Sequence, residues 1–323
     1  MTYKPPFTIT NNILNLCQGV SKELGFLEGT KILTPSIQLR KDNQIKTIQS
    51  SLAIEGNSLS EEHITHILEG RRVLAPEKDI IEVENALKLY QTLNQFDALS
   101  ISSILEAHSI LMQSLIAENG KWRSGGVGII SKEGISHMAP QAKMVSGLMS
   151  QLFEFLKREK ELSWLIKACV FHYELEFIHP FSDGNGRMGR LWQQLLLMKE
   201  HNVFEYLSIE SLIKKNQKEY YTILSACDKQ GESTLFIEFM LRIILKSLSE
   251  YSKGLVLPNI NCSTRLEYSR KLLANKCFSR KDYILVHKNI SMATASRDLK
   301  WGLENKLLLS EGSYNQIKYS YIK

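Results

Sequence analysis

Residues 179–190 read HPFSDGNGRMGR, which places an imidazole, a carboxylate, three glycines and two arginines in one turn and the start of a helix. The run that follows, residues 191–199, is helical in pattern, so Arg187 and Arg190 fall in the first turns on one face. Cations are disfavoured there, because the macrodipole and the free N–H groups make a helix N-terminus partly positive. Two arginines at this end therefore predict a bound anion.

The residues just before the arginines support a phosphate as that anion. Gly184, Asn185 and Gly186 let the backbone approach closely and direct several N–H groups at one point, which is how proteins prepare a phosphate site. Asp183 beside them is suited to a hard cation such as Mg²⁺. We expect an anion and metal site here.

The composition is that of a soluble globular protein. Of the 323 residues, 43% are hydrophobic and 23% charged, and this length allows more than one domain. There is no apolar run long enough for a membrane span and no signal-peptide pattern at the start, so we expect a cytoplasmic protein without a membrane partner. The five cysteines are scattered and never form a C-x-x-C pair, which argues against a disulfide framework or a zinc site.

Most of the chain has helical periodicity, which predicts a mainly α fold. The expected helices cover residues 9–28, 42–55, 60–70, 81–95, 101–117, 143–157, 162–178, 208–227 and 235–251. The exception is residues 122–140, where glycines and β-branched residues predict a short hairpin. The helix over residues 162–178 would deliver His179 from its C-terminal end.

The motif HPFSDGNGRMGR resembles the H-x-F-x-[DE]-G-N-G-R-x-x-R signature of the Fic family, enzymes that typically transfer AMP from ATP to a protein hydroxyl. The resemblance covers about residues 1–250 and implies the Fic-fold helical core. It implies that His179 is the general base and that Asp183 binds Mg²⁺. The family's phosphate-transferring members have Lys where this chain has Gly186, so AMP transfer is favoured.

The same resemblance assigns the phosphate contacts. The backbone of residues 184–186 and the Asn185 side chain would hold the phosphates of ATP. Arg187 would neutralise the leaving pyrophosphate, and Arg190 would pair with the γ-phosphate. Phe181 would face the core.

A second motif, residues 51–56 with the sequence SLAIEG, resembles the [ST]-x-x-x-E-[GN] inhibitory motif of many Fic proteins. Glu55 lies in the last turn of a predicted helix, where the dipole disfavours an anion, and Arg190 offers the matching cation. Ser51 is one turn earlier on the same face and could steady the carboxylate, and Gly56 ends the helix. We expect residues 42–56 to form an inhibitory helix.

Two further features follow from the resemblance. The hairpin would be the family's flap, which holds a target segment by strand addition, with Ile135, Ser136, His137 and Met138 as the binding edge. Tyr221 would lie near the base of ATP. Asp228 stands where the family commonly has Asn, and a carboxylate cannot donate to a ring nitrogen, which puts base preference in question.

The C-terminal region is basic, with 12 Lys/Arg against 5 Asp/Glu in residues 261–323. Its pattern predicts helices over 265–274, 280–287 and 292–307, then a hairpin over 308–322, which resembles a winged helix-turn-helix. The third helix would expose Thr294, Arg297 and Lys300 to a DNA groove. The stretch 313–316 lacks an arginine for a phosphate, so protein docking or homodimerisation remains an alternative use.

The predicted organisation has four parts. These are an N-terminal helical region (1–75), a Fic catalytic core (76–253), a linker (254–263) and a winged helix-turn-helix domain (264–323). The leading hypothesis is an autoinhibited protein adenylyltransferase that uses ATP and Mg²⁺ and modifies a Ser, Thr or Tyr hydroxyl of a target protein or of itself. The alternatives are a DNA-binding regulator with the core as nucleotide sensor, or an enzyme that removes AMP.

Overall fold

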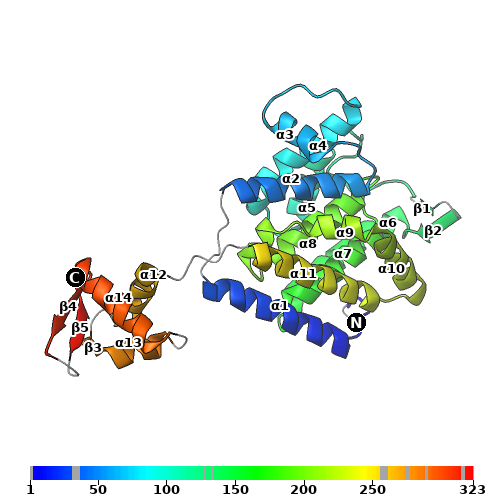
Figure 1. The fold of residues 1–323 in the computed structure, drawn as a ribbon. Coiled ribbons are helices and arrows are strands. Elements are labelled where there is room, and N and C mark those ends of the chain that lie inside the picture. The colour runs from blue at the N-terminus through cyan, green and yellow to red at the C-terminus, as the bar shows by residue number, and fades with distance from the viewer. Residues whose placement is uncertain are drawn as a thin grey trace. The chain divides into compact units, whose positions relative to one another are not determined.

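The structure, a computed structural model, describes residues 3–30, 37–126, 128–131, 134–254, 261–273, 276–287, 290–313 and 317–322, with the backbone alone at residues 30, 37, 128–131, 134–138 and 254. It divides into two compact units, Met1–Leu255 and Val256–Lys323 (Figure 1). The predicted segments 1–75 and 76–253 share the first unit. Residues 255–260 of the predicted linker lie outside the described residues.

Among its described residues, the first unit is helical apart from one antiparallel hairpin, which confirms the mainly α prediction. In chain order it contains α1 (Asn11–Thr30), α2 (Ile37–Ile54), α3 (Glu61–Leu68), α4 (Glu77–Gln91), η1 (Leu93–Gln95), α5 (Ile101–Leu111), β1 (Gly128–Ser131), β2 (Gly134–Met138), α6 (Ala142–Arg158), α7 (Trp164–Ile178), α8 (Asn185–Leu197), η2 (Asn202–Tyr206), α9 (Ile209–Lys215), α10 (Gln217–Gln230) and α11 (Thr234–Gly254).

The centre of this unit is the pair α7 and α8, which pack against each other (Figure 1). Helix α7 is apolar on nearly all sides and almost wholly buried, as expected of a helix surrounded by others. It packs against α6 and α11, while α2 contacts α8 from another side. The loop between α7 and α8 holds the motif, so two buried helices that pack against each other position it.

The end of α2 has a defined stop. The N–H of Asn57 donates to the Leu52 carbonyl (3.1 Å) and the N–H of Gly56 to the Ala53 carbonyl (3.1 Å). Together with the left-handed φ of +94° at Gly56, these bonds form a Schellman motif, in which glycine is favoured because it has no Cβ. Glu55 is therefore the capping residue, held in a fixed turn.

Two predicted helices differ from the observed ones: one is shorter and one is divided in two. The predicted helix over 101–117 ends at Leu111, since Met112 caps it and Ser114 takes a left-handed φ of 63°. The predicted helix over 208–227 is two helices, α9 and α10, that meet at Asn216. The Asn216 amide donates to the Leu212 carbonyl (2.8 Å), which satisfies a carbonyl at the end of α9.

The second unit contains α12 (Cys262–Leu273), β3 (Phe278–Ser279), α13 (Arg280–Val286), α14 (Met292–Glu304), β4 (Leu308–Glu311) and β5 (Lys318–Tyr321). Its antiparallel sheet has the order β3-β5-β4. The three predicted helices and the final hairpin are confirmed as elements, and β3 was missed. A bidentate ion pair joins α12 to α14, from the partly buried Arg265 to the buried Asp298 at 2.5 and 2.7 Å.

Across the part of the chain that the structure describes, no helix combines the length and apolar character that crossing a membrane requires.

Candidate active site

The motif loop begins with an unusual backbone conformation at His179. This residue caps α7 with a φ of 50° and a ψ of 60°. These angles lie in the left-handed region, which residues other than glycine rarely occupy. Such conformations cost about 1–3 kcal/mol and persist where the surroundings enforce them, often at functional sites. The turn ends at Gly184, which is the N-cap of α8 and has a left-handed φ of 85°.

The side chains of Phe181 and Asn185 fix the shape of the loop. Phe181 is fully buried, as predicted, and stacks on His108 with ring centroids 3.7 Å apart. The Asn185 side chain accepts from the Phe181 N–H and donates to the Phe181 carbonyl, both at 2.9 Å. Although we expected this side chain to bind phosphate, the backbone of Phe181 occupies it. A phosphate contact at Asn185 would come from its backbone N–H in the first turn of α8.

The His179 imidazole is oriented by the backbone of α7. Its Nδ1 lies 3.3 Å from the Glu176 carbonyl oxygen. A carbonyl can only accept, so this contact favours the proton on Nδ1 and makes Nε2 the basic nitrogen. The ring is partly exposed, so it can reach a substrate.

Arg123 connects this loop to the hairpin, a role that no sequence pattern indicated. Its guanidinium is buried and donates to the carbonyls of His179 (2.7 Å), Gly125 (2.8 Å) and Pro140 (2.5 Å). Gly125 and Pro140 flank the two strands of the hairpin. One side chain therefore holds both ends of the hairpin and the turn at His179, and its burial lowers the pKa of Arg123.

The two motif arginines point to different partners. Arg187 donates to Glu82 Oε1 (3.1 Å) on α4 and to Asp183 Oδ1 (3.3 Å) within the loop. Arg190 donates from Nη2 to Glu55 Oε1 (2.7 Å), and it donates to the hydroxyl (3.1 Å) and the backbone carbonyl (3.0 Å) of Ser51. Both guanidinium groups are buried, and carboxylates neutralise both.

The structure thus brings the predicted inhibitory motif to the predicted phosphate site. Ser51 binds Arg190 instead of steadying Glu55, because its hydroxyl faces the guanidinium. The Glu55 carboxylate reaches the N-terminus of α8, where a Cβ on Gly186 would overlap its oxygen. A side chain at this position would require the Glu55 carboxylate to shift. Although Glu55 caps the negative end of α2, its carboxylate lies at the positive end of α8.

Acidic side chains other than Glu55 also lie near Arg190 and affect its charge. Burial alone would lower its pKa, but the charges of Glu55 and Glu176 raise it above the usual range. Burial opposes ionisation of Glu176 too, but a hydrogen bond with His172 and nearby cations outweigh it and lower its pKa. Glu210 is fully buried, which raises its pKa to about 7 despite the opposing charge of Arg190.

The predicted base-binding residues lie on α10. Tyr221 is about half exposed, whereas its neighbour Tyr220 is buried and donates to Glu176 (3.2 Å). Asp228 accepts a hydrogen bond from the Tyr173 hydroxyl (3.0 Å). Tyr221 is therefore open to solvent, and Asp228 is engaged by α7.

The hairpin and the C-terminal unit contain the remaining predicted residues. Ile135, Ser136, His137 and Met138 lie in β2, which pairs antiparallel with β1, and their side chains lie outside the described residues. On α14, Arg297 and Lys300 are exposed and Thr294 is half-buried. Residues 314–316 of the predicted wing lie outside the described part of the chain.

Four residues that contact the site were not assigned to it from the sequence: His108, Arg123, Glu82 and Asn57. Glu82 had a usable signal, because it falls at helical spacing from Ala86 and Leu89 on the buried face of α4. Asn57 had none, because it stands in the polar stretch 55–58. His108 was interpreted as structural and is buried, which lowers its pKa to about 4. Its Nε2 lies 3.0 Å from the Asp183 carbonyl, so it supports the backbone of the motif loop at Asp183.

Comparison with known proteins agrees with this geometry. Residues 98–197 match the model of the Fic/DOC family. Among curated relatives, the protein adenylyltransferase Fic of Aedes aegypti is 28% identical over 221 residues, which cover 65% of this chain and 42% of the relative. A probable protein adenylyltransferase of Aquifex aeolicus is 27% identical over 199 residues, covering 55% of this chain and 58% of that protein. The chain spans less than half the length of the Aedes relative.

A solved structure matches nearly the whole chain. The Fic family protein from Desulfovibrio desulfuricans G20 is 35% identical, has a TM-score of 0.74, and is aligned over 99% of this chain and 98% of its own. A Fic domain containing signaling protein from Bacteroides thetaiotaomicron, 22% identical with a TM-score of 0.61, shares the fold over 78% of this chain. With the motif, the geometry and this full-length relative in agreement, the chain belongs to the Fic family.

Proposed function

We propose that the protein is an adenylyltransferase that moves AMP from ATP to a Ser, Thr or Tyr hydroxyl of a target protein or of itself, and that Glu55 inhibits it. The observation that carries this proposal is the pairing of two buried arginines with carboxylates beside a strained, partly exposed histidine. The names of the curated relatives support the same reaction type.

In this proposal His179 Nε2 takes the proton of the target hydroxyl as its oxygen bonds to the α-phosphorus. The bond between that phosphorus and the oxygen bridging to the β-phosphate breaks, and pyrophosphate leaves. The N–H groups at the start of α8 and the Arg187 guanidinium stabilise charge on the phosphates. Arg190 pairs with the γ-phosphate and so orients the nucleotide for attack in line.

Asp183 fits a nucleotide-bound Mg²⁺. Its side chain is half exposed at the edge of the loop. Mg²⁺ is commonly held by one or two carboxylates together with substrate phosphates, so a single carboxylate is a sufficient protein contribution. In the described part of the chain, His, Cys, Asp and Glu form no cluster able to hold a metal on its own. When bound, Mg²⁺ would neutralise phosphate charge.

Autoinhibition follows from the contact between Glu55 and Arg190. The carboxylate holds the cation that the γ-phosphate would need, and it lies where anionic phosphates would approach the start of α8. Binding of ATP in a reactive position then requires Glu55 to move. We propose that the turn after α2 opens to allow this.

The hairpin and α10 would bind the two substrates. Strand β2 would accept a target segment as an added strand. This binding mode depends on backbone hydrogen bonds, so it indicates little about which side chains the target has. Tyr221 would contact the adenine, and Asp228 would accept from its amino group. The exposed Arg297 and Lys300 on α14 are the residues through which the C-terminal unit would meet DNA.

The experiment that tests the reaction type uses ATP labelled at either the α- or the γ-phosphate. We expect label from α-labelled ATP to appear on protein, none from γ-labelled ATP, and none with either after His179→Ala. The assay is run with the Glu55→Gly protein and a heat-inactivated cell lysate as target source, so that kinases of the lysate do not transfer the γ-phosphate. Absence of transfer, with ATP and DNA binding retained, would instead favour a nucleotide-sensing DNA regulator. Loss of AMP from modified protein that depends on Glu55 would indicate the reverse reaction.

A further inference from the structure

Arg187 occupies an unfavourable position that needs a permanent counter-ion. It is in the first turn of α8, where the helix dipole opposes a cation, and it is 5% exposed. Removing a guanidinium from water without an anion beside it is strongly unfavourable. Two carboxylates are within 4 Å, those of Glu82 and Asp183.

These two carboxylates differ in burial. The Glu82 side chain is 7% exposed and lies 3.1 Å from Nη1, whereas the Asp183 side chain is 50% exposed and lies 3.3 Å from Nη2. Attraction between charges is stronger where water is excluded, so Glu82 is the stronger partner. Lys78 approaches Glu82 only at 4.0 Å from an exposed position, so it competes weakly.

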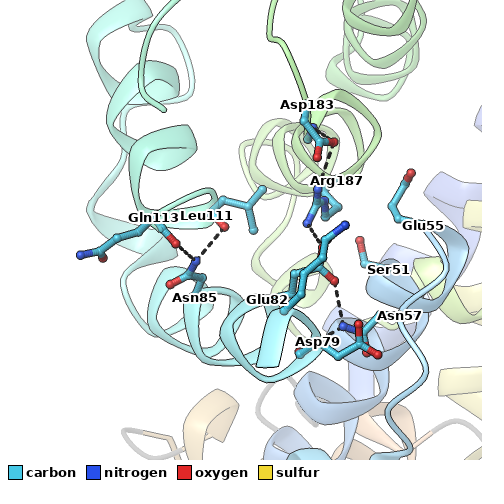
Figure 2. A network of polar contacts seen from close by, with 12 residues as sticks. Ser51, Glu55, Asn57, Asp79, Glu82, Asn85, Leu111, Gln113, Asp183 and Arg187 are labelled. Carbon is cyan, nitrogen blue, oxygen red and sulfur yellow. Dashed lines mark hydrogen bonds and ion pairs between the residues drawn. The ribbon is translucent and has the colours of Figure 1, made fainter. Parts of the chain in front are cut away.

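Glu82 is itself held in place by Asn57. The Asn57 amide donates to Glu82 Oε2 (2.8 Å) and to the Asp79 carbonyl (3.1 Å), and its oxygen accepts from the Leu59 N–H (3.0 Å). Each Glu82 oxygen therefore has its own partner, Arg187 or Asn57. Figure 2 shows this chain of contacts running from Asn57 through Glu82 and Arg187 to Asp183.

We infer that Glu82 is a positioning residue for Arg187, and that Asn57 orients Glu82 in turn. The inference rests on the proposed function. Glu82 neutralises the guanidinium and fixes its direction toward the phosphates. Because Arg187 keeps Glu82 as a partner, Asp183 remains available to a nucleotide-bound metal.

One turn therefore acts on both arginines with opposite effects, on Arg190 directly and on Arg187 through Glu82. Glu55 and Asn57 lie two residues apart in the Schellman turn after α2. Glu55 blocks Arg190, so its loss raises AMP transfer. Asn57 supports Arg187 through Glu82, so its loss lowers AMP transfer.

The test compares Glu82→Gln, Glu82→Asp and Asn57→Ser in the Glu55→Gly protein, with Glu84→Gln as the control because Glu84 is exposed on the same helix. The substitution by Gln keeps the shape and removes the charge. We measure kcat and KM for ATP, the Mg²⁺ concentration for half-maximal transfer, Tm, and ATP affinity by calorimetry with and without Mg²⁺.

We expect Glu82→Gln to lower kcat/KM about 10- to 100-fold, as loss of a partner behind a ligand-contacting group does. We also expect it to raise the Mg²⁺ requirement and to weaken ATP binding. Glu82→Asp should recover part of the loss, Asn57→Ser should show a smaller loss, and Glu84→Gln should match its parent. A lower Tm with unchanged KM, Mg²⁺ requirement and ATP affinity would overturn the inference, because it would show a purely structural role.

Failure of the proposed function gives a different result. If Glu55→Gly transfers no AMP, the reaction type is wrong, and ATP affinity alone then decides the role of Glu82. Weaker ATP binding in Glu82→Gln would support the positioning role, and equal binding would overturn it. If Glu82→Gln does not fold, the same comparison with Asn57→Ser decides the question.

Discussion

Arg190 donates a 2.7 Å hydrogen bond to Glu55, a residue 135 positions earlier in the chain. The contact brings together two charges that are each unfavourable in their own helix, an anion at the C-terminus of α2 and a cation near the N-terminus of α8. Their pairing removes both mismatches. It also occupies the cation that the proposed reaction assigns to the γ-phosphate.

Removal of Glu55 should destabilise the resting protein. Glu55→Gly leaves Arg190 buried with only Ser51 as its hydrogen-bond partner among the contacts described above, and we expect a loss of about 1–3 kcal/mol. The loss is smaller than the roughly 3–5 kcal/mol of a fully buried pair, because the Glu55 side chain is 33% exposed. Thermal unfolding measures it, and Mg²⁺-ATP should restore part of the Tm.

The matched control for that experiment is Glu69→Gly. Glu69 also caps a helix, α3, and is also followed by a glycine with a left-handed φ, Gly70. It pairs with Lys41 and Arg71, which are more exposed than Arg190. An equal loss of Tm in both variants would show that backbone freedom explains the effect.

Ser51→Ala should leave the inhibition in place, because Ser51 contacts Arg190 and the change leaves the Glu55 contact intact. The change removes the hydrogen bond from Arg190 Nε to the hydroxyl and keeps the bond to the Ser51 carbonyl. One such bond is worth about 1 kcal/mol, so we expect a small loss of Tm and no rise in AMP transfer comparable to that of Glu55→Gly. Thermal unfolding and initial rates with α-labelled ATP measure the two effects, and a rise in rate equal to that of Glu55→Gly would contradict this role.

Arg123→Lys should impair the catalytic turn and the hairpin together. Lysine keeps a positive charge but cannot span the carbonyls of His179, Gly125 and Pro140 with one planar group. Misplacement of His179 by about 1 Å could cost about 100-fold in rate. We expect kcat to fall by at least about tenfold, with faster amide exchange in residues 125–140. Arg71→Lys, at an exposed position, serves as control and should change neither.

Glu210 should make stability depend on pH. Burial raises its pKa from 4.5 to about 7, so the folded state binds a proton more tightly than the unfolded state does. The contribution of this group to the free energy of unfolding is fully present below pH 4.5 and is lost as the pH rises through 7. We expect the Tm of Glu210→Gln to rise relative to that of the unmodified protein as the pH is increased from 5 to 8. A difference that is flat over this range would contradict the assignment.

The sequence predicted local features of the site well, because they depend on neighbouring residues. The α7–turn–α8 arrangement follows from the motif, and the stop at Gly56 follows from glycine chemistry. The contact between Glu55 and Arg190 could also be predicted, because each charge was unfavourable in its own helix. The family resemblance then supplied the identity of the anion.

The contacts that were missed depend on tertiary packing. Arg123 is 56 residues from His179, and Glu82 is 105 residues from Arg187. Helical periodicity shows that Glu82 lies on the buried face of α4 but does not show which cation it meets. The same limit applies to Ser51, whose spacing from Glu55 suggested a bond between them, although the packing of α2 on α8 directs its hydroxyl to Arg190.

The most direct test of the account is the rate of AMP transfer by Glu55→Gly relative to the unmodified protein. Both proteins are incubated with α-labelled ATP and Mg²⁺, with Glu69→Gly and the double variant Glu55→Gly, His179→Ala as controls. We predict that Glu55→Gly transfers AMP at least about tenfold faster, which corresponds to about 1.4 kcal/mol, that Glu69→Gly matches the unmodified protein, and that the double variant is inactive. An equal rate in Glu55→Gly and the unmodified protein would contradict inhibition by Glu55.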